Sequence, residues 1–240
     1  SELAIAGFFG RVNYNYKERY MLEANLRYDG SSRFVGDKRW GLFPSFSAGW
    51  NIAREDFFRP LAGVIGTLKL RGSWGQLGNN NTDKANAWYP FYQNMITGSA
   101  NSGWLIDSKK QNTAQLPGIV NSLMTWETIE SWDIGLDFGL LDNRLTGSVG
   151  YYNRYTYDMI GPAPILPPVL GALPPQVNNC DMKSYGWELE LSWRDRISEF
   201  DYSARFVLSD GKRKILRYPN PTNSLSSDVY YNGQILGVIW

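Results

Sequence analysis

A strict alternation of apolar and polar residues over long segments most limits how this chain can fold. From Tyr20 to Asp29 the even positions are apolar or aromatic, whereas the odd positions from Glu23 onward are polar or charged. A period of two is typical of a β-strand with one apolar face. The same pattern recurs in eight segments in all, at residues 8–16, 20–29, 42–52, 68–74, 127–138, 145–155, 185–194 and 200–209. The sequence therefore predicts an all-β fold.

The length of these segments indicates strands that cross a membrane. Most of them run for about 10 to 12 residues, whereas strands of soluble proteins average about 5 to 6, and a tilted strand of about 10 residues crosses a bilayer. Sixteen charged side chains fall in the polar phase and only Glu130 falls in the apolar phase. Tyr and Trp side chains lie near the segment ends, as in the aromatic girdles of outer-membrane barrels. We expect one face of the sheet to contact water and the other to contact lipid, with Glu130 above the hydrocarbon layer.

The connections between the segments predict an antiparallel meander. Short links at 17–19, 140–143 and 195–199 alternate with longer ones at 30–39, 77–125 and 158–182. Outer-membrane barrels place short turns on the periplasmic side and long loops outside, so 77–125 and 158–182 are predicted to be long extracellular loops. The link at 53–66 falls in the short group but is longer, and its apolar content predicts a small packed turn or short helix.

Composition excludes several kinds of chemistry. The 240 residues contain no His and one Cys, and the net charge is +1. Catalytic Ser-His or Cys-His pairs, thiolate metal cages and disulfide frameworks are therefore excluded, and no charge excess recruits nucleic acid. Glu188 and Glu190 lie within roughly 7 Å on one strand face, a spacing that would suit a glycosidase. A water-filled interior presents such carboxylates too, so we expect no catalytic residue, metal or cofactor.

Two groups of residues are candidates for contact with a ligand. The loop 77–125 combines rings, which can stack on sugars, with amides that satisfy hydroxyls; packing against neighbouring loops or a partner is equally consistent with this composition. The candidates for substrate binding are Asn79, Asn80, Trp88, Tyr89, Tyr92 and Trp104. The polar-phase candidates, expected to line a water-filled lumen, are Arg27, Asp29, Arg71, Asp133, Glu188, Glu190 and Arg205.

Several motifs in fixed order resemble the barrel of SusC/RagA-type TonB-dependent transporters. They include RYDGSSRF at 27–34, FPSFSAGW at 43–50 and WETIESWDIGLDFGLLDNRLTGSVGYYNRYTYDMI at 126–160. The resemblance covers most of the chain outside its long loops. It implies a large barrel of about 22 strands whose lumen holds a plug domain. Residues 1–240 would then be a section of that barrel with about eight strands and without the plug.

The resemblance also implies a function and a location. Members of this family import oligosaccharides or peptides across the Gram-negative outer membrane by TonB-coupled, gated transport. The implied partners are a SusD-like surface lipoprotein, the TonB-ExbB-ExbD complex acting through the plug, the lipid bilayer and lipopolysaccharide. From the residues alone, two alternatives stay open. One is a soluble or surface all-β glycan-binding module, and the other is a passive eight-stranded barrel in which the first and last strands pair.

Overall fold

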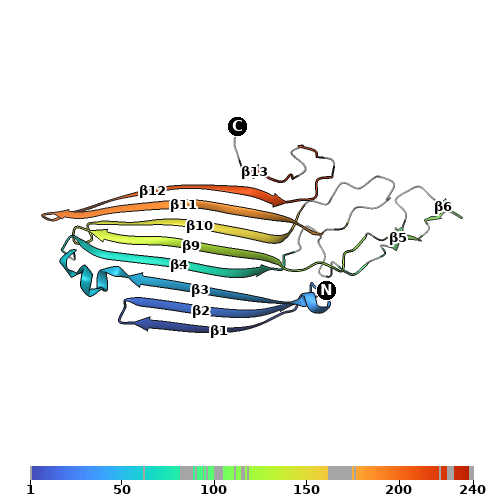
Figure 1. Ribbon diagram of the computed structural model, residues 1–240. Helices are drawn as coiled ribbons and strands as arrows, with labels where there is room; N and C mark the ends of the chain where they lie inside the picture. Colours follow the sequence, from blue (N-terminus) through green and yellow to red (C-terminus); the bar gives the residue numbers. More distant parts are fainter. Residues whose placement is uncertain are drawn as a thin grey trace.

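A computed structural model describes residues 2–61, 63–81, 89, 91–93, 95, 97–99, 105–110, 112–114, 117, 119–161, 175, 177–221, 223–225 and 230–237. Within these residues the chain forms one nine-stranded antiparallel sheet in the order β1-β2-β3-β4-β9-β10-β11-β12-β13. Its long strands lie side by side in a single curved layer (Figure 1). The predicted all-β antiparallel meander is confirmed.

The strands of the large sheet are β1 (Ile5–Tyr16), β2 (Tyr20–Ser31), β3 (Trp40–Asn51), β4 (Ile65–Asn79), β9 (Glu127–Leu140), β10 (Leu145–Ile160), β11 (Asn178–Ile197), β12 (Phe200–Arg217) and β13 (Ile235–Leu236). Two small hairpins lie in the connection after β4: β5 (Thr97–Ser99) with β8 (Asn112–Ala114), and β6 (Leu105–Ile106) with β7 (Lys109–Lys110). Three 3₁₀ helices complete the elements: η1 (Gly36–Arg39), η2 (Ile52–Arg54) and η3 (Asp56–Leu61). No helix among the described residues is long and apolar enough to span a membrane.

Strand register keeps the two phases on separate faces of the sheet. One row runs through five strands as Leu70, Leu136, Val149, Leu189 and Leu208, each opposite the next. Side chains alternate between the faces of a strand, so a slip of one residue at any pairing would mix the phases. The sheet therefore has a continuous apolar face and a continuous polar face.

The connections sort by length to the two ends of the sheet. The short turns between β1 and β2, β9 and β10, and β11 and β12 lie at one end of the sheet, and the strand ends that lead into the long connections lie at the other (Figure 1). The link at 53–66 belongs to the short-turn end and contains η2 and η3, with Phe58 buried, as its apolar content predicted.

Several strands are longer than the sequence pattern indicates, among them β10, β11 and β12 at the long-connection end. β10 continues to Ile160, β11 starts at Asn178 and β12 continues to Arg217. Only residues 161–177 therefore separate β10 from β11, whereas the sequence pattern assigned 158–182 to the loop. Backbone pairing requires no apolar face once a strand has left the hydrocarbon layer, so alternation does not mark where these strands end.

The sheet remains open along both edges. Among the described residues β1 pairs with β2 alone, and β12 pairs with β11 and with two residues of β13. The passive eight-stranded barrel requires pairing between β1 and β12, and the described strands do not form it.

Two small apolar clusters lie at the long-connection end. One contains Phe34, Phe43, Met124, Trp126 and Ile160, and the other contains Cys180, Ile215 and Tyr218. The ring of Phe43 lies over Gly78, where a Cβ atom would collide with it. These clusters bury the bases of the loops, whereas most side chains on the apolar face of the sheet are exposed to whatever surrounds the molecule.

A polar cluster ties the opposite end together. The Glu55 carboxylate accepts a hydrogen bond from the Trp50 indole at 3.0 Å and pairs with Arg19 at 3.3 Å. Hydrogen bonds from the Tyr20 hydroxyl and from Trp50 hold the pKa of Glu55 below its ordinary value, and the Arg19 charge adds to this effect. Glu55 thus connects the η2–η3 segment to the adjacent ends of β2 and β3.

We predict that the two faces of β10 respond oppositely to a new charge. Val149→Arg places a cation in the central apolar row and is expected to destabilise the folded protein by about 2–4 kcal/mol, the cost of Arg near a bilayer midplane. Ser148→Arg is the matched control, since Ser148 lies on the polar face opposite Asp137 and Glu190. Urea unfolding of the membrane-inserted full-length protein measures both, and equal destabilisation would contradict the assignment of the faces.

We also predict a pH-dependent contribution from Glu55. Its pKa is lower in the folded state, so the ionised carboxylate stabilises this end of the sheet above its ordinary pKa. That stabilisation is lost as the pH falls through the lowered, folded-state pKa. The difference in unfolding free energy between the wild type and Glu55→Gln should therefore shrink on acidification. Glu18, an exposed carboxylate that pairs with Arg54 at the same end of the sheet, supplies the control Glu18→Gln. A difference between the wild type and Glu55→Gln that stays constant with pH would refute the prediction.

Candidate functional site

A cluster of alternating charges occupies the centre of the polar face. Arg71 on β4 lies between two carboxylates of β9, at 3.6 Å from Asp133 and 3.4 Å from Asp137. The Ser73 hydroxyl donates a hydrogen bond to Asp133. The guanidinium lies over Gly135, where a Cβ atom would collide with it. Close approach of the arginine to the sheet therefore depends on a residue without a side chain.

Two shallow hollows adjoin this cluster and share Arg71 and Asp133. The first has a volume of about 530 Å³, and its polar lining includes Asn13, Glu23, Ser47, Lys69 and Ser73. The second has a volume of about 550 Å³, and its lining includes Tyr152, Arg154, Ser184, Glu188 and Arg213. Both hollows offer donors, acceptors and charges of both signs, which suits polar ligand groups that exchange water for hydrogen bonds.

Register places all seven polar-phase candidates on this face. Besides Arg71 and Asp133, Arg27 pairs with Asp29 at 3.1 Å on the same strand. Glu190 pairs with Arg205 across β11 and β12 at 2.8 Å, and Glu188 lines the second hollow. Among the described residues, no group of three or more His, Cys, Asp or Glu side chains is arranged to hold a metal ion.

The structure describes four of the six substrate-binding candidates of the 77–125 segment, and their surroundings differ. The Asn79 amide donates to Glu127 at 2.6 Å, and the Asn80 amide donates to the Ser31 hydroxyl at 3.1 Å. Both asparagines thus tie the loop base to neighbouring segments. The Tyr89 hydroxyl donates to the Glu2 carbonyl at 2.8 Å, whereas Tyr92 is 66% exposed. Trp88 and Trp104 lie outside the described residues.

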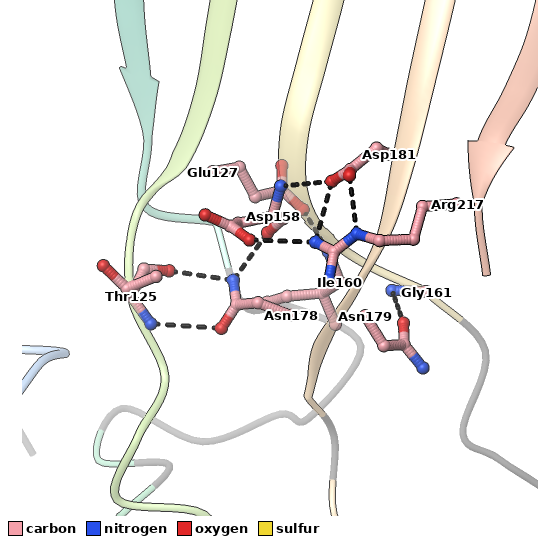
Figure 2. Close-up of polar contacts among 9 residues, drawn as sticks. All are labelled: Thr125, Glu127, Asp158, Ile160, Gly161, Asn178, Asn179, Asp181 and Arg217. Carbon is pink, nitrogen blue, oxygen red and sulfur yellow. Dashed lines mark hydrogen bonds and ion pairs between the residues drawn. The ribbon is translucent and has the colours of Figure 1, made fainter. Parts of the chain in front are cut away.

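An ion-pair network that the sequence did not reveal joins the strand ends beneath the long loops (Figure 2). Arg217, the last residue of β12, binds both carboxylate oxygens of Asp181, with distances of 2.6 and 2.9 Å. It also pairs with Asp158 on β10 at 3.1 Å. One guanidinium therefore fastens together three consecutive strands.

Asn178 extends this network to the other long connection. Its amide nitrogen donates to the carbonyls of Asp158 at 2.6 Å and Thr125 at 3.0 Å, and its amide oxygen accepts from the Thr125 N–H at 3.1 Å. Glu127 accepts from the Ile160 N–H at 2.8 Å. The segments that lead into both long loops are thereby fixed to one another at the rim of the sheet.

We predict that this network holds the loop bases. Asn178→Ala removes the partners of three backbone groups and is expected to cost about 1–3 kcal/mol of local stability. Arg217→Gln, which removes the charge shared by two carboxylates, should act in the same direction. Proteolysis rates within 77–125 and 158–182 of the folded full-length protein measure the effect.

Arg205→Gln provides the control for that measurement. It breaks an ion pair on the same β11–β12 hairpin but touches no loop base. Loop cleavage should stay at the wild-type rate in Arg205→Gln and rise in the two network variants. Unchanged cleavage in Asn178→Ala and Arg217→Gln would show that the network does not restrain the loops.

The fold and the site together define a class of protein. Long antiparallel strands with one apolar and one polar face, short turns at one end and long loops at the other are the features of an outer-membrane β-barrel wall. The chain belongs to the TonB-dependent receptor-like β-barrel family, whose model matches residues 2–239. Membership in this family places the chain in the outer membrane.

Individual relatives agree with this assignment. The chain is 34% identical over 229 residues to the TonB-dependent receptor SusC of Bacteroides thetaiotaomicron, a match that covers 94% of this chain and 22% of SusC. It is 31% identical over 222 residues to the TonB-dependent receptor P3 of Formosa agariphila, covering 92% of this chain and 21% of P3. The chain thus spans about a fifth of the length of these relatives.

Solved structures share the fold. The RagAB peptide importer in its closed-closed state matches with a TM-score of 0.76 and 23% identity, over 90% of this chain and 23% of the matched chain. The siderophore receptor PirA of Pseudomonas aeruginosa matches with a TM-score of 0.53 and 15% identity, over 90% of this chain and 37% of PirA. These two similarities concern the arrangement of strands.

Proposed function

We propose that this chain is a section of an outer-membrane importer that takes up oligosaccharides or peptides by TonB-coupled, gated transport. The observation that carries the proposal is the family match over residues 2–239. The sheet agrees with it, since one of its faces is apolar and the other polar. In this proposal the apolar face contacts lipid and the polar face lines the passage. Binding and gated passage, without covalent chemistry, account for the function.

The polar face supports a polar substrate. Arg27, Asp29, Arg71, Asp133, Glu188, Glu190 and Arg205 would line the lumen and keep it hydrated. Their charges of both signs suit a neutral sugar chain or a peptide, each of which carries many donors and acceptors. The RagAB structures are of a peptide importer, which supports the peptide branch of the proposal.

The long loops supply the outer part of the proposed binding site. We assign 77–125 and 158–182 to the extracellular side, where Trp88, Tyr89, Tyr92 and Trp104 would contact substrate or a partner. Asn79 and Asn80 would act at the loop base, since their amides already bond to Glu127 and Ser31. A SusD-like surface lipoprotein is the proposed lid, and a TonB-ExbB-ExbD complex is the proposed source of energy.

The proposed transport predicts energy-dependent uptake that requires this protein. A strain lacking the full-length transporter should lose uptake of a labelled oligosaccharide mixture or peptide mixture, and the restored gene should return it. A protonophore or loss of TonB should abolish that uptake, because TonB-coupled transport requires both the proton gradient and TonB. Diffusion through a passive pore requires neither the gradient nor TonB. Uptake that persists in the presence of the protonophore would contradict the proposal.

The same cells test the lid and the loop residues. Full-length protein extracted in detergent should bring down a lipidated SusD-like partner. Trp88→Ala and Trp104→Ala should weaken substrate affinity or partner binding. If substrate affinity and partner binding both stay at wild-type levels, the two Trp rings only pack within the loop and are not part of the substrate site.

A further inference from the structure

The second hollow of the polar face contains an aromatic side chain that lies along the sheet. Tyr152 of β10 is opposite Gly186 of β11, which in turn is opposite Gly211 of β12. A Cβ atom at Gly186 would lie 2.8 Å from the Tyr152 hydroxyl oxygen, and a Cβ atom at Gly211 would lie 2.7 Å from it. The tyrosine side chain therefore extends across β11 to β12 close to the backbone, a position that depends on two neighbours without side chains.

The Tyr152 ring is accessible from the polar side of the sheet. It is half-buried and belongs to the lining of the hollow of about 550 Å³. Among the described residues, its hydroxyl group has no hydrogen-bond partner. A ring supported by the sheet on one side and open on the other is a surface on which the apolar C–H face of a sugar ring can stack.

Two arginines without partners lie next to this ring, on the side of the long loops. Arg154 of β10 and Arg213 of β12 are both opposite Ser184 of β11, so their Cα atoms are about 10 Å apart at the usual strand spacing. Both are exposed and line the same hollow. Within the part of the chain that the structure describes, neither side chain forms an ion pair or a hydrogen bond, whereas Arg71 in this hollow is paired.

The charges of the hollow sum to zero, but they are segregated. Its lining carries three arginines and the two carboxylates Asp133 and Glu188, and Asp137 beside it pairs with Arg71. Arg71, Asp133 and Asp137 thus neutralise one another on β4 and β9. Glu188 lies four residues from Ser184 along β11, about 13 Å away toward the short turns. Cations and a carboxylate therefore lie on opposite sides of the tyrosine ring.

An uncharged row separates the two arginines from the charges at the rim. It contains, each opposite the next, Ile129, Thr156, Met182 and Ile215. Beyond this row Asp158 and Asp181 pair with Arg217, and Glu127 accepts two hydrogen bonds. The described carboxylates at the rim are therefore engaged there and do not neutralise the two arginines.

This arrangement matches a sugar ring that carries a carboxylate. A guanidinium group binds a carboxylate through two parallel N–H donors. Sugar hydroxyls can donate to Glu188 and accept from Ser184 while the ring stacks on Tyr152. The carboxylate of a peptide would also bind the arginines, but a peptide backbone has no row of hydroxyl groups for the acceptors beside the ring. The observations therefore favour an acidic sugar.

We propose that Tyr152, Arg154 and Arg213 form a binding site on the wall of the passage for an oligosaccharide whose rings carry carboxylates. Tyr152 supports a sugar ring, and the two arginines bind its carboxylate. The inference rests on the proposed function, since it takes the polar face as the wall of the passage. It selects acidic sugar chains among the substrates considered there.

Binding to the purified full-length transporter in detergent tests the site. The probes are the tetrasaccharides of galacturonic acid and of mannuronic acid, with their methyl esters as neutral counterparts. The wild type should bind at least one acid about tenfold or more tightly than its ester, because hydrogen bonds between charged groups are the strong ones. R154Q/R213Q should lose this preference. Both arginines are exposed and unpaired within the described chain, so their replacement removes no contact that the fold needs.

Arg194→Gln is the matched control for the arginine variant. Arg194 is an exposed arginine of β11 in the phase of Glu188, ten residues from Ser184 toward the short turns. This variant should keep the wild-type preference for the acid. A wild type that binds neither acid, or binds acid and ester equally, would overturn the proposal. An unchanged preference in R154Q/R213Q would overturn it as well.

Tyrosine variants test the ring. Tyr152→Ala should weaken the binding of acid and ester alike by several-fold, since stacking does not depend on the carboxylate. Tyr152→Phe keeps the ring and should bind more tightly than Tyr152→Ala. Equal binding by the wild type and Tyr152→Ala would remove the ring from the site. Tetraglutamate supplies the peptide arm: if it binds through the two arginines and the sugar acids do not bind, the site is a peptide site and the proposal is wrong.

Uptake measurements distinguish a failure of this proposal from a failure of the proposed function. TonB-dependent uptake of the oligosaccharide or peptide mixture, together with no preference for the acid probes, overturns the site and leaves the transport function intact. Arginine-dependent binding of an acid probe without TonB-dependent uptake supports the site and contradicts the transport function.

Discussion

Interstrand hydrogen bonding is the constraint on which this structure depends. In hydrocarbon, each backbone N–H and C=O needs a partner within the protein, and an antiparallel sheet supplies partners only between neighbouring strands. Pairing fixes register, and register in turn decides which side chains share a face. Because Leu136 is opposite both Leu70 and Val149, the apolar face continues from strand to strand. The polar wall with Arg71 and Asp133 follows from the same register on the opposite face.

At the long-loop rim the strands have left the hydrocarbon layer, and contacts between side chains hold the structure together there. Phe34, Phe43 and Trp126 pack beneath the loop bases, and Arg217 and Asn178 bond to segments that enter and leave both long connections. The rim is therefore fixed by specific side-chain contacts, whereas the middle of the sheet is fixed by backbone pairing and by its surroundings.

The charges on the apolar face follow from height. Lys183, Lys212 and Lys214 share a phase with leucines but lie where the strands leave the hydrocarbon layer. Nearer the middle of the bilayer a charged side chain would be costly. The phase of a residue alone therefore does not say whether its side chain lies within the hydrocarbon layer or beyond it.

The sequence by itself determined the strands, their faces and the meander, because alternation with a period of two is a local property and turn lengths are read directly along the chain. It also placed Arg27, Asp29 and Glu190 in the polar phase. Only the tertiary structure decided where β10, β11 and β12 end, that Arg217 joins Asp158 to Asp181, and that Lys183 lies opposite Lys214. Those partners are separated by 31 to 59 residues along the chain and meet through strand register, which includes bulges near Met159 and Met182. A local pattern carries no information about such a meeting, because it depends on the pairing of every residue between the partners.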